Sequence, residues 1–134
     1  MTAVKIPVRT SKPTEMVDIT ARVSEAVRRS GVSEGLCTVF VAHTTAGVTI
    51  NENFDPDVRH DFLGALERMV PLASPDYRHD EGNSAAHVKA SLVGSSATVI
   101  VAAGRLQLGT WQALFFCEFD GPRSREAWVK VMAG

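Results

Sequence analysis

The chain lacks features that several large classes of protein require. Its 134 residues carry 14 Lys and Arg against 15 Asp and Glu, a formal net charge of -1. It therefore lacks the positive excess that non-specific nucleic-acid binding needs. No apolar run approaches the ~20 residues of a membrane span, and the segment MTAVKIPVRT contains no apolar signal core. We expect a protein that binds neither nucleic acid nor membrane.

Cysteine is also scarce. Cys37 and Cys117 lie inside the apolar runs LCTVFVA and ALFFCEF, where a thiol packs as a small hydrophobic group. Two buried, reduced thiols favour a reducing compartment, so we expect a cytoplasmic protein. The motifs GxxxxGK[ST], GxGxxG and GxSxG are absent as well, which disfavours the common nucleotide-binding folds and the serine-hydrolase elbow.

Length and patterning predict a single domain over residues 1–134. The chain is 45% hydrophobic and 22% charged, as is ordinary for a globular protein. Apolar and β-branched runs predict strands over Val4–Val8, Leu36–Ala42, Gly47–Ile50, Thr98–Ala102, Trp111–Phe119 and Ala127–Met132. We expect Gly47–Ile50 to be the antiparallel partner or the continuation of the strand before it. Trp111–Phe119 is apolar on both faces and is therefore expected at the centre of a sheet.

Three helices are expected between these strands. The first begins at Asp18 or Thr20 and ends near Ser30, where Gly31 suits a left-handed stop. Asp55-Pro56 begins the second, which Pro71 ends, and the third runs from Ser84 to Val93. This order of elements predicts an α+β fold with a largely antiparallel sheet or sandwich core.

Two polar segments stand out: His43–Asp61, HTTAGVTINENFDPDVRHD, and Tyr77–Lys89, YRHDEGNSAAHVK. They contain all four histidines of the chain. His79 and His87 are separated by acidic and amide side chains that suit zinc or a similar ion. Their spacing matches neither HExxH nor a zinc finger, so an ordinary polar loop remains an alternative.

The other polar residues of these segments also have two interpretations. His43 follows a buried strand, where it is either a functional group or a turn histidine satisfied by one hydrogen bond. Asp61 shares a polar helix face with Asp57, for which the alternative is an exposed acidic face, and Glu52 lies between two asparagines. We expect His60 to be a surface residue.

Further candidates lie outside the two segments. The run GRLQLGTWQ, residues 104–112, is either a ligand-contacting loop or a tight hairpin with a core or interface tryptophan. Gly121-Pro122-Arg123 is a turn with a possible anion contact. The start of the helix at Ser84 offers unpaired amides that favour an anion.

Taken together, five ordered motifs are similar to the YjbQ/UPF0047 family, described as secondary thiamine-phosphate synthases. The motifs are HTTAGVTINEN, DPDVRHD, YRHDEGN with AHVKASLVG, GRLQLGTWQ and FDGPR, over about Val17 to Val131. The resemblance implies a compact, β-rich homotrimer with pockets near subunit boundaries. The matching polar positions are His43, Thr44, Thr45, Glu52, Asp61, His79, Asn83, His87, Lys89, Gly109, Thr110, Trp111 and Gln112. One departure is the short EGNSAAH, with Ala85 where many members carry an aspartate.

The resemblance implies an enzyme that joins a hydroxymethylpyrimidine pyrophosphate to a thiazole phosphate and releases pyrophosphate. Its expected catalytic residues are His43, Glu52, Asp61, His79 and His87, with a divalent ion, zinc or magnesium, bound by His43, His79 and His87. The expected substrate contacts are Thr44, Thr45, Asn83, Lys89, Arg105, Thr110, Trp111, Gln112 and Arg123. The alternative is a metal- or anion-binding module for a small phosphorylated or carboxylated ligand.

Overall fold

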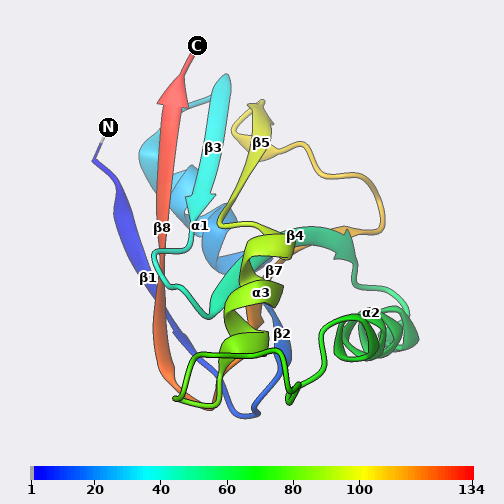
Figure 1. Cartoon of the computed structure of the whole chain (residues 1–134). Coiled ribbons are helices and arrows are strands. Elements are labelled where there is room, and N and C mark those ends of the chain that lie inside the picture. Colours follow the sequence, from blue (N-terminus) through cyan, green and yellow to red (C-terminus); the bar gives the residue numbers. More distant parts are fainter. Residues whose placement is uncertain (1) are drawn as a thin grey trace.

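A computed structural model describes residues 2–134 and shows two antiparallel sheets and three helices. The five-stranded sheet has the order β1-β8-β3-β5-β6 and the three-stranded sheet the order β2-β7-β4. The strands are β1 (Val4–Arg9), β2 (Glu15–Asp18), β3 (Gly35–Phe40), β4 (Ala46–Glu52), β5 (Ser96–Ala102), β6 (Arg105–Leu106), β7 (Gln112–Glu118) and β8 (Ser124–Ala133). The helices are α1 (Thr20–Ser30), α2 (Pro56–Met69) and α3 (Ser84–Val93). The predicted α+β class is confirmed (Figure 1).

Two apolar layers hold the elements together. The inner faces of both sheets meet α1 in a core that includes Val23, Val39, Val129 and Phe116. The opposite face of the three-stranded sheet packs against α2 and α3, with Phe115 at its centre. β7 is therefore buried on both faces, which explains its unbroken apolar sequence and confirms its predicted central position.

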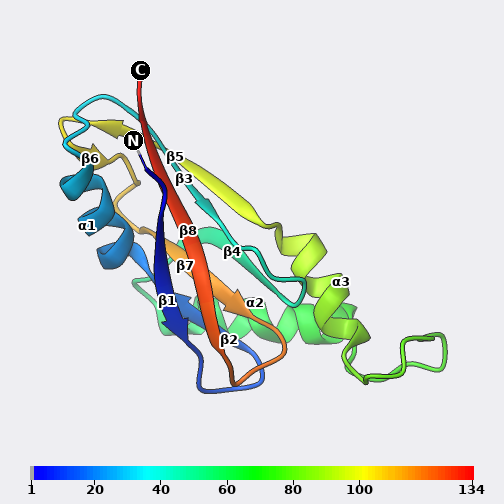
Figure 2. The same cartoon turned by 90° about the vertical axis from the view of Figure 1, so that its left-hand side faces the viewer.

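The outer face of the five-stranded sheet has no such cover. Leu36, Phe40, Ile100, Trp128 and Met132 all point outward and are 37–62% exposed. The strand register pairs Leu36 with both Ile100 and Met132, and Phe40 with Trp128. Apolar side chains thus run across three neighbouring strands of this face. Figure 2 shows the long ribbons of β1 and β8 at this side of the molecule.

The boundaries of the helices follow local chemistry. The Asp55 carboxylate accepts a hydrogen bond from the backbone N–H of Asp57 (2.9 Å), and Pro56 occupies the first turn of α2. Gly31 ends α1 with φ 71°, in the left-handed region that glycine adopts readily. The third predicted helix, Ser84–Val93, is confirmed at both ends.

One predicted pairing is wrong. Gly47–Ile50 belongs to β4, which pairs with β7 in the three-stranded sheet and not with the preceding strand β3. The chain changes sheets between Phe40 and Ala46, so nearness in sequence does not give a shared sheet here. A further strand, β2, was not predicted, since Glu15–Asp18 has no alternating apolar pattern.

Within residues 2–134, no helix combines the length and the apolar character needed to cross a bilayer.

Candidate functional site

The first candidate residues lie where the chain crosses between the two sheets. At the start of this crossing, the Val41 N–H donates to the Ser95 carbonyl (2.7 Å). At its end, the Phe119 N–H donates to the Thr45 carbonyl (3.2 Å). The crossing is thus fixed to both sheets, with His43 and Thr44 between the two anchors. This agrees with the expectation that functional groups gather where a strand leaves the core.

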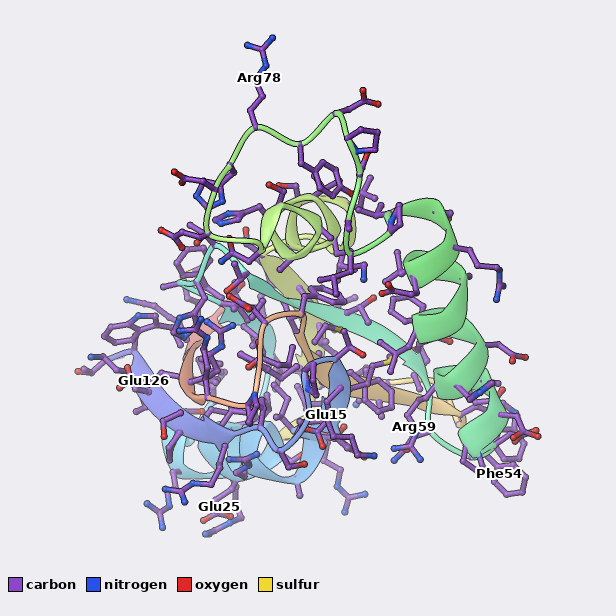
Figure 3. The ribbon with its side chains drawn as sticks, turned by 60° about the horizontal axis from the view of Figure 1, so that its bottom comes forward. Glu15, Glu25, Phe54, Arg59, Arg78 and Glu126 are labelled. Carbon is purple, nitrogen blue, oxygen red and sulfur yellow. The ribbon has the colours of Figure 1, made fainter. Side chains whose placement is uncertain are left out.

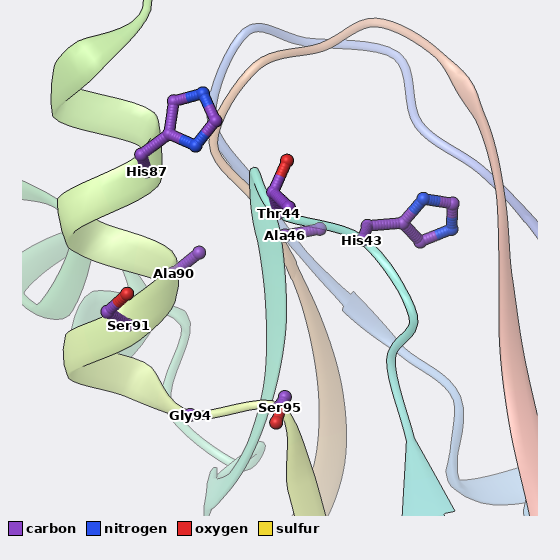
Figure 4. A pocket seen from close by; sticks show the side chains of 8 residues that line it. All are labelled: His43, Thr44, Ala46, His87, Ala90, Ser91, Gly94 and Ser95. Atoms are coloured by element: carbon purple, nitrogen blue, oxygen red, sulfur yellow. The ribbon is translucent and has the colours of Figure 1, made fainter.

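A cavity of about 470 Å³ opens beside this crossing. We call it the histidine hollow; it is lined by Ala42, His43, Thr44, Thr45, His79, Glu81, Asn83, His87, Asp120, Arg123 and Arg125. A second cavity of about 400 Å³ adjoins it, sharing His43, Thr44 and His87 and extending along α3 past Ser91 to Ser95 (Figure 4). Two sequence segments that are far apart, the crossing and the start of α3, therefore form one polar depression.

The histidines of the hollow do not all face one another. The rings of His79 and His87 lie 5.3 Å apart between centroids, at an interplanar angle of 78°. The ring of His43 points away from α3 (Figure 4), and its Nε2 accepts a hydrogen bond from the backbone N–H of Glu126 (3.1 Å). The proton of neutral His43 is therefore on Nδ1. Burial lowers the pKa of His43, and the nearby Arg125 guanidinium lowers it further.

These positions do not form a complete metal site in one chain. Among residues 2–134, no group of three or more His, Cys, Asp or Glu side chains is placed to hold a metal ion. His79 and His87 form a pair, and Glu81 Oε1 lies 4.0 Å from His79 Nε2, whereas a protein zinc site takes three or four ligands at ~2 Å. The zinc or magnesium ion stays a sequence prediction, to be tested by elemental analysis of the purified protein.

A buried ion pair supports the floor of the hollow. Glu118 is fully buried and accepts hydrogen bonds from Thr10 Oγ1 (2.7 Å), the Asp120 N–H (3.0 Å) and Arg125 Nε (2.9 Å). Burial raises the pKa of the Glu118 carboxyl, but these hydrogen bonds outweigh burial and its net pKa lies below the ordinary value. Glu118 is therefore ionised, and Arg125 Nη2 also donates to Thr45 Oγ1 (2.8 Å). The pair fixes one hydroxyl of the hollow.

The rim of the hollow is joined to this floor through Asp120. Its Oδ2 accepts hydrogen bonds from both Asn83 Nδ2 (2.9 Å) and Arg123 Nη2 (2.9 Å). The second atom of the Asn83 amide, Oδ1, is buried and has no hydrogen-bond partner among the described residues 2–134. Two guanidinium groups, two hydroxyl groups and two facing imidazoles thus surround one space, a set that suits an oxyanion.

Several expected substrate contacts lie outside the hollow. Lys89 is 3% exposed, and its Nζ contacts Glu67 Oε2 at 2.5 Å beside a separate cavity. Thr110, Trp111 and Gln112 line another cavity, in which Trp111 packs edge-on against Phe54 at 4.9 Å. Figure 3 shows Phe54 far from the loop that carries Arg78. Arg105 lines a third cavity, next to α1.

Two expected catalytic carboxylates are also away from the hollow. Glu52 ends β4 opposite Gln112, and its side chain is half-buried. Asp61 lies on α2 with 81% of its side chain exposed, next to His60, which is exposed as expected. Neither residue lines the histidine hollow. A single chain therefore brings together His43, Thr44, Thr45, His79, Asn83, His87 and Arg123 and places the remaining candidates elsewhere.

Sequence reasoning missed Glu118, Asp120 and Arg125. A signal was present for the arginine: Arg125, Ala127, Val129 and Val131 alternate along β8 and all point inward. A charge in an inward-facing series must find a partner. The signal for Glu118 is its place directly after the apolar run of β7.

Comparison with known proteins agrees with this fold. A family model described as "UPF0047 protein YjbQ-like" matches residues 4–134. The chain belongs to the YjbQ/UPF0047 family. It is 49% identical to the UPF0047 protein YugU of Bacillus subtilis, over 95% of this chain and 96% of the relative. It is 49% identical to a UPF0047 protein of Methanocaldococcus jannaschii, over 96% and 92% of the two chains.

Solved structures share the fold of this chain. The crystal structure of a Clostridium acetobutylicum member superposes with a TM-score of 0.94 at 52% identity, over 96% of this chain and 99% of that chain. A hypothetical protein from Aeropyrum pernix reaches the same TM-score of 0.94 at 32% identity, over the full length of both chains. The YjbQ/UPF0047 fold is thus kept while two thirds of the residues differ.

Proposed function

We propose that the histidine hollow binds the phosphate groups of a small ligand. The observation that supports this most is the pair of facing imidazoles, His79 and His87, in a cavity that also holds Arg123 and Arg125. Guanidinium groups suit phosphate because they donate two parallel hydrogen bonds. Both arginines also contact carboxylates, so a phosphate would share their donors, and the imidazoles and Thr44 would supply the rest.

We further propose that the reaction is the one that the family resemblance implies, formation of thiamine phosphate. The bond between the pyrimidine methylene carbon and a pyrophosphate oxygen breaks, and the thiazole nitrogen forms a new bond to that carbon. The attacking nitrogen uses its lone pair and carries no proton, so no general base is needed. The protein has to hold the two substrates in line and stabilise the charge on the departing pyrophosphate.

The residues of the hollow match these needs. Arg123 and Thr44 can bind the leaving pyrophosphate through charge-assisted and neutral hydrogen bonds. His79 or His87 can act as the general acid that donates a proton to it. The second candidate function, a binding module without catalysis, uses the same contacts and differs only in turnover.

The assay separates these two functions. Pure protein is incubated with both thiamine precursors and magnesium, and thiamine phosphate is measured, with a proven synthase as positive control. We expect product from the unmutated chain and at least ~100-fold less from His79→Ala and His87→Ala, the range for loss of an acid catalyst. His60→Ala is the matched control, since His60 has an 85% exposed side chain outside the hollow. No product from the unmutated chain would reject the synthase proposal, and calorimetry with pyrophosphate would then test binding alone.

We also propose that the protein assembles as a homotrimer, as the family resemblance implies. In support, the uncovered outer face of the five-stranded sheet carries Leu36, Phe40, Ile100 and Met132, and exposed apolar faces of this kind commonly mark protein interfaces. Light scattering should give about three times the 14.4 kDa of one chain, and a clean monomer would contradict the proposal. We propose that the protein is located in the cytoplasm, because both cysteines are free and buried, as in a reducing compartment.

A further inference from the structure

A cavity of about 490 Å³ lies between α1 and the hairpin formed by β5 and β6. We call it the α1 cavity; it is lined by Thr20, Ser24 and Arg28 of α1 and by residues 103–106 and Leu108. None of these residues lines the histidine hollow. Figure 2 shows α1 and β6 together at the end of the molecule away from α3. The α1 cavity is therefore a separate space, outside the proposed phosphate site.

The turn that joins β5 to β6 has an unusual backbone. Ala103 has φ 52° and Gly104 has φ 72°, and Ala103 is the one non-glycine residue with positive φ among residues 2–134. Two successive positive φ values are typical of a type I′ hairpin turn, which favours asparagine, aspartate or glycine. Alanine is strained there, because its Cβ disfavours the left-handed region. Such strain occurs preferentially at ligand sites, and here it places a small, uncharged methyl group at the cavity.

Hydrogen bonds hold this turn in place. The Ala103 N–H donates to Glu34 Oε1 (3.2 Å), and the Gly104 N–H donates to the Ser33 carbonyl (3.0 Å). The side-chain amide of Gln107 donates to two carbonyls of the same hairpin (3.1 and 3.3 Å). One wall of the cavity is thus fixed before a ligand enters, which lowers the cost of ordering it on binding.

One cation of the cavity has no partner carboxylate. Arg28 donates to both oxygens of Glu25, and Arg29 shares the same carboxylate. Arg105 is exposed and takes part in none of the ion pairs of residues 2–134. A guanidinium can donate two parallel hydrogen bonds to the two oxygens of a carboxylate. A single unpaired guanidinium therefore suits a monoanion better than a doubly charged phosphate.

The remaining lining is part hydroxyl and part apolar. Thr20 Oγ1 accepts a hydrogen bond from the Leu114 N–H (2.9 Å), so its own hydrogen can be donated to a ligand. Ser24 offers a second hydroxyl one turn further along α1. Leu106 and Leu108 are only partly buried against the main core. The cavity thus combines donors for an anion with an apolar wall.

We propose that the α1 cavity binds a small monocarboxylate that carries a compact apolar group. The carboxylate pairs with Arg105 and accepts a hydrogen bond from the hydroxyl of Thr20 or Ser24. The apolar group lies against Leu106 and Leu108. The volume of about 490 Å³ falls within the ~300–1,000 Å³ of pockets that hold small ligands.

The probe is benzoate, a carboxylate on one apolar ring, added to the full chain at neutral pH and followed by NMR titration. Benzamide keeps the shape without the charge, and acetate keeps the charge without the ring. We expect benzoate to shift the signals of residues 103–108 and to bind at least about tenfold more tightly than either control. Arg105→Gln should weaken benzoate binding about tenfold. Arg78→Gln, at the tip of the loop in Figure 3, is the matched control and should leave it unchanged.

A pair of variants at the strained turn separates binding from folding. Aspartate and asparagine tolerate the left-handed region better than alanine, so Ala103→Asp and Ala103→Asn should both keep the urea midpoint of the unmutated chain or raise it. The aspartate charge should repel the ligand, so Ala103→Asp should bind benzoate about tenfold or more weakly than Ala103→Asn. The inference is overturned if benzoate does not bind, binds no better than benzamide or acetate, shifts the signals of His43 and His87 instead, or binds the two Ala103 variants equally.

Discussion

Replacing Arg125 by methionine should destabilise the protein strongly. The substitution keeps much of the side-chain volume but leaves Glu118, which is 0% exposed, as an ionised carboxylate without its cation. Breaking one partner of a buried ion pair typically costs ~3–5 kcal/mol. A domain of this size has a free energy of unfolding of ~5–15 kcal/mol, so Arg125→Met should retain its fold with a much lower urea midpoint.

The pH dependence tests the cause of this loss. In the unmutated protein the pKa of Glu118 is lowered, so its stabilising contribution is present above the unfolded pKa and is lost as pH falls through the folded pKa. In Arg125→Met the hydrogen bonds from arginine are gone and burial dominates, which raises the pKa of Glu118 above the unfolded value. A carboxyl whose pKa is higher in the folded state than in the unfolded state stabilises the fold at low pH. The loss of unfolding free energy caused by Arg125→Met should therefore shrink as the pH falls from about 7 to about 5.

Urea unfolding at both pH values measures this effect. Glu118→Gln combined with Arg125→Met should cost less than the sum of the two single changes, because the charge left alone by Arg125→Met is removed. Arg29→Met is the matched control: Arg29 pairs with Glu25 at the surface, where such pairs contribute little. A cost for Arg125→Met that stays below ~1 kcal/mol, or that does not shrink in acid, would refute the buried-pair reasoning.

Two further outcomes follow from burial and close packing. Burial raises the pKa of the Cys37 and Cys117 thiols to about 11 and about 12, so a thiol reagent at neutral pH should label neither native cysteine and both after unfolding. Rapid labelling of the native protein would contradict this. A Cβ added at Gly47 would lie 2.6 Å from the Gly94 carbonyl oxygen, so Gly47→Ala should cost ~1–3 kcal/mol. Gly64→Ala, inside α2 and 3.4 Å from a flexible arginine tip, should instead be neutral or stabilise by up to ~1 kcal/mol, and equal effects would argue against the clash.

The parts of the fold that the sequence predicts best depend on local chemistry. Asp55-Pro56 begins α2 because a carboxylate and a proline satisfy the first turn without help from elsewhere. The pairing of β4 depends instead on which distant strand it meets, and its residues Gly47–Ile50 contain no local sign of β7. The strand β2 was not predicted because Glu15–Asp18 has no alternating apolar pattern.

The candidate site divides in the same way. His43, His79 and His87 were singled out by their clustering, and all three line one cavity. Glu118 and Arg125 were overlooked because a charged side chain is usually read as exposed, whereas their meeting depends on the register of distant strands. Trp111 and Lys89 belong to the family motifs but line cavities other than the histidine hollow. Only the three-dimensional structure reveals this separation.

The two facing histidines are held by very different means. His87 belongs to α3, while His79 lies in the irregular loop between α2 and α3, which projects from the body of the molecule and carries Arg78 at its tip (Figure 3). A ligand held between the two rings would therefore close a loop anchored at both ends by helices. The entropic free-energy cost of closing such a loop rises by only ~0.6 kcal/mol for each doubling of loop length. Insertions and deletions in this loop can thus accumulate at small cost to ligand affinity, provided that His79 can still lie opposite His87.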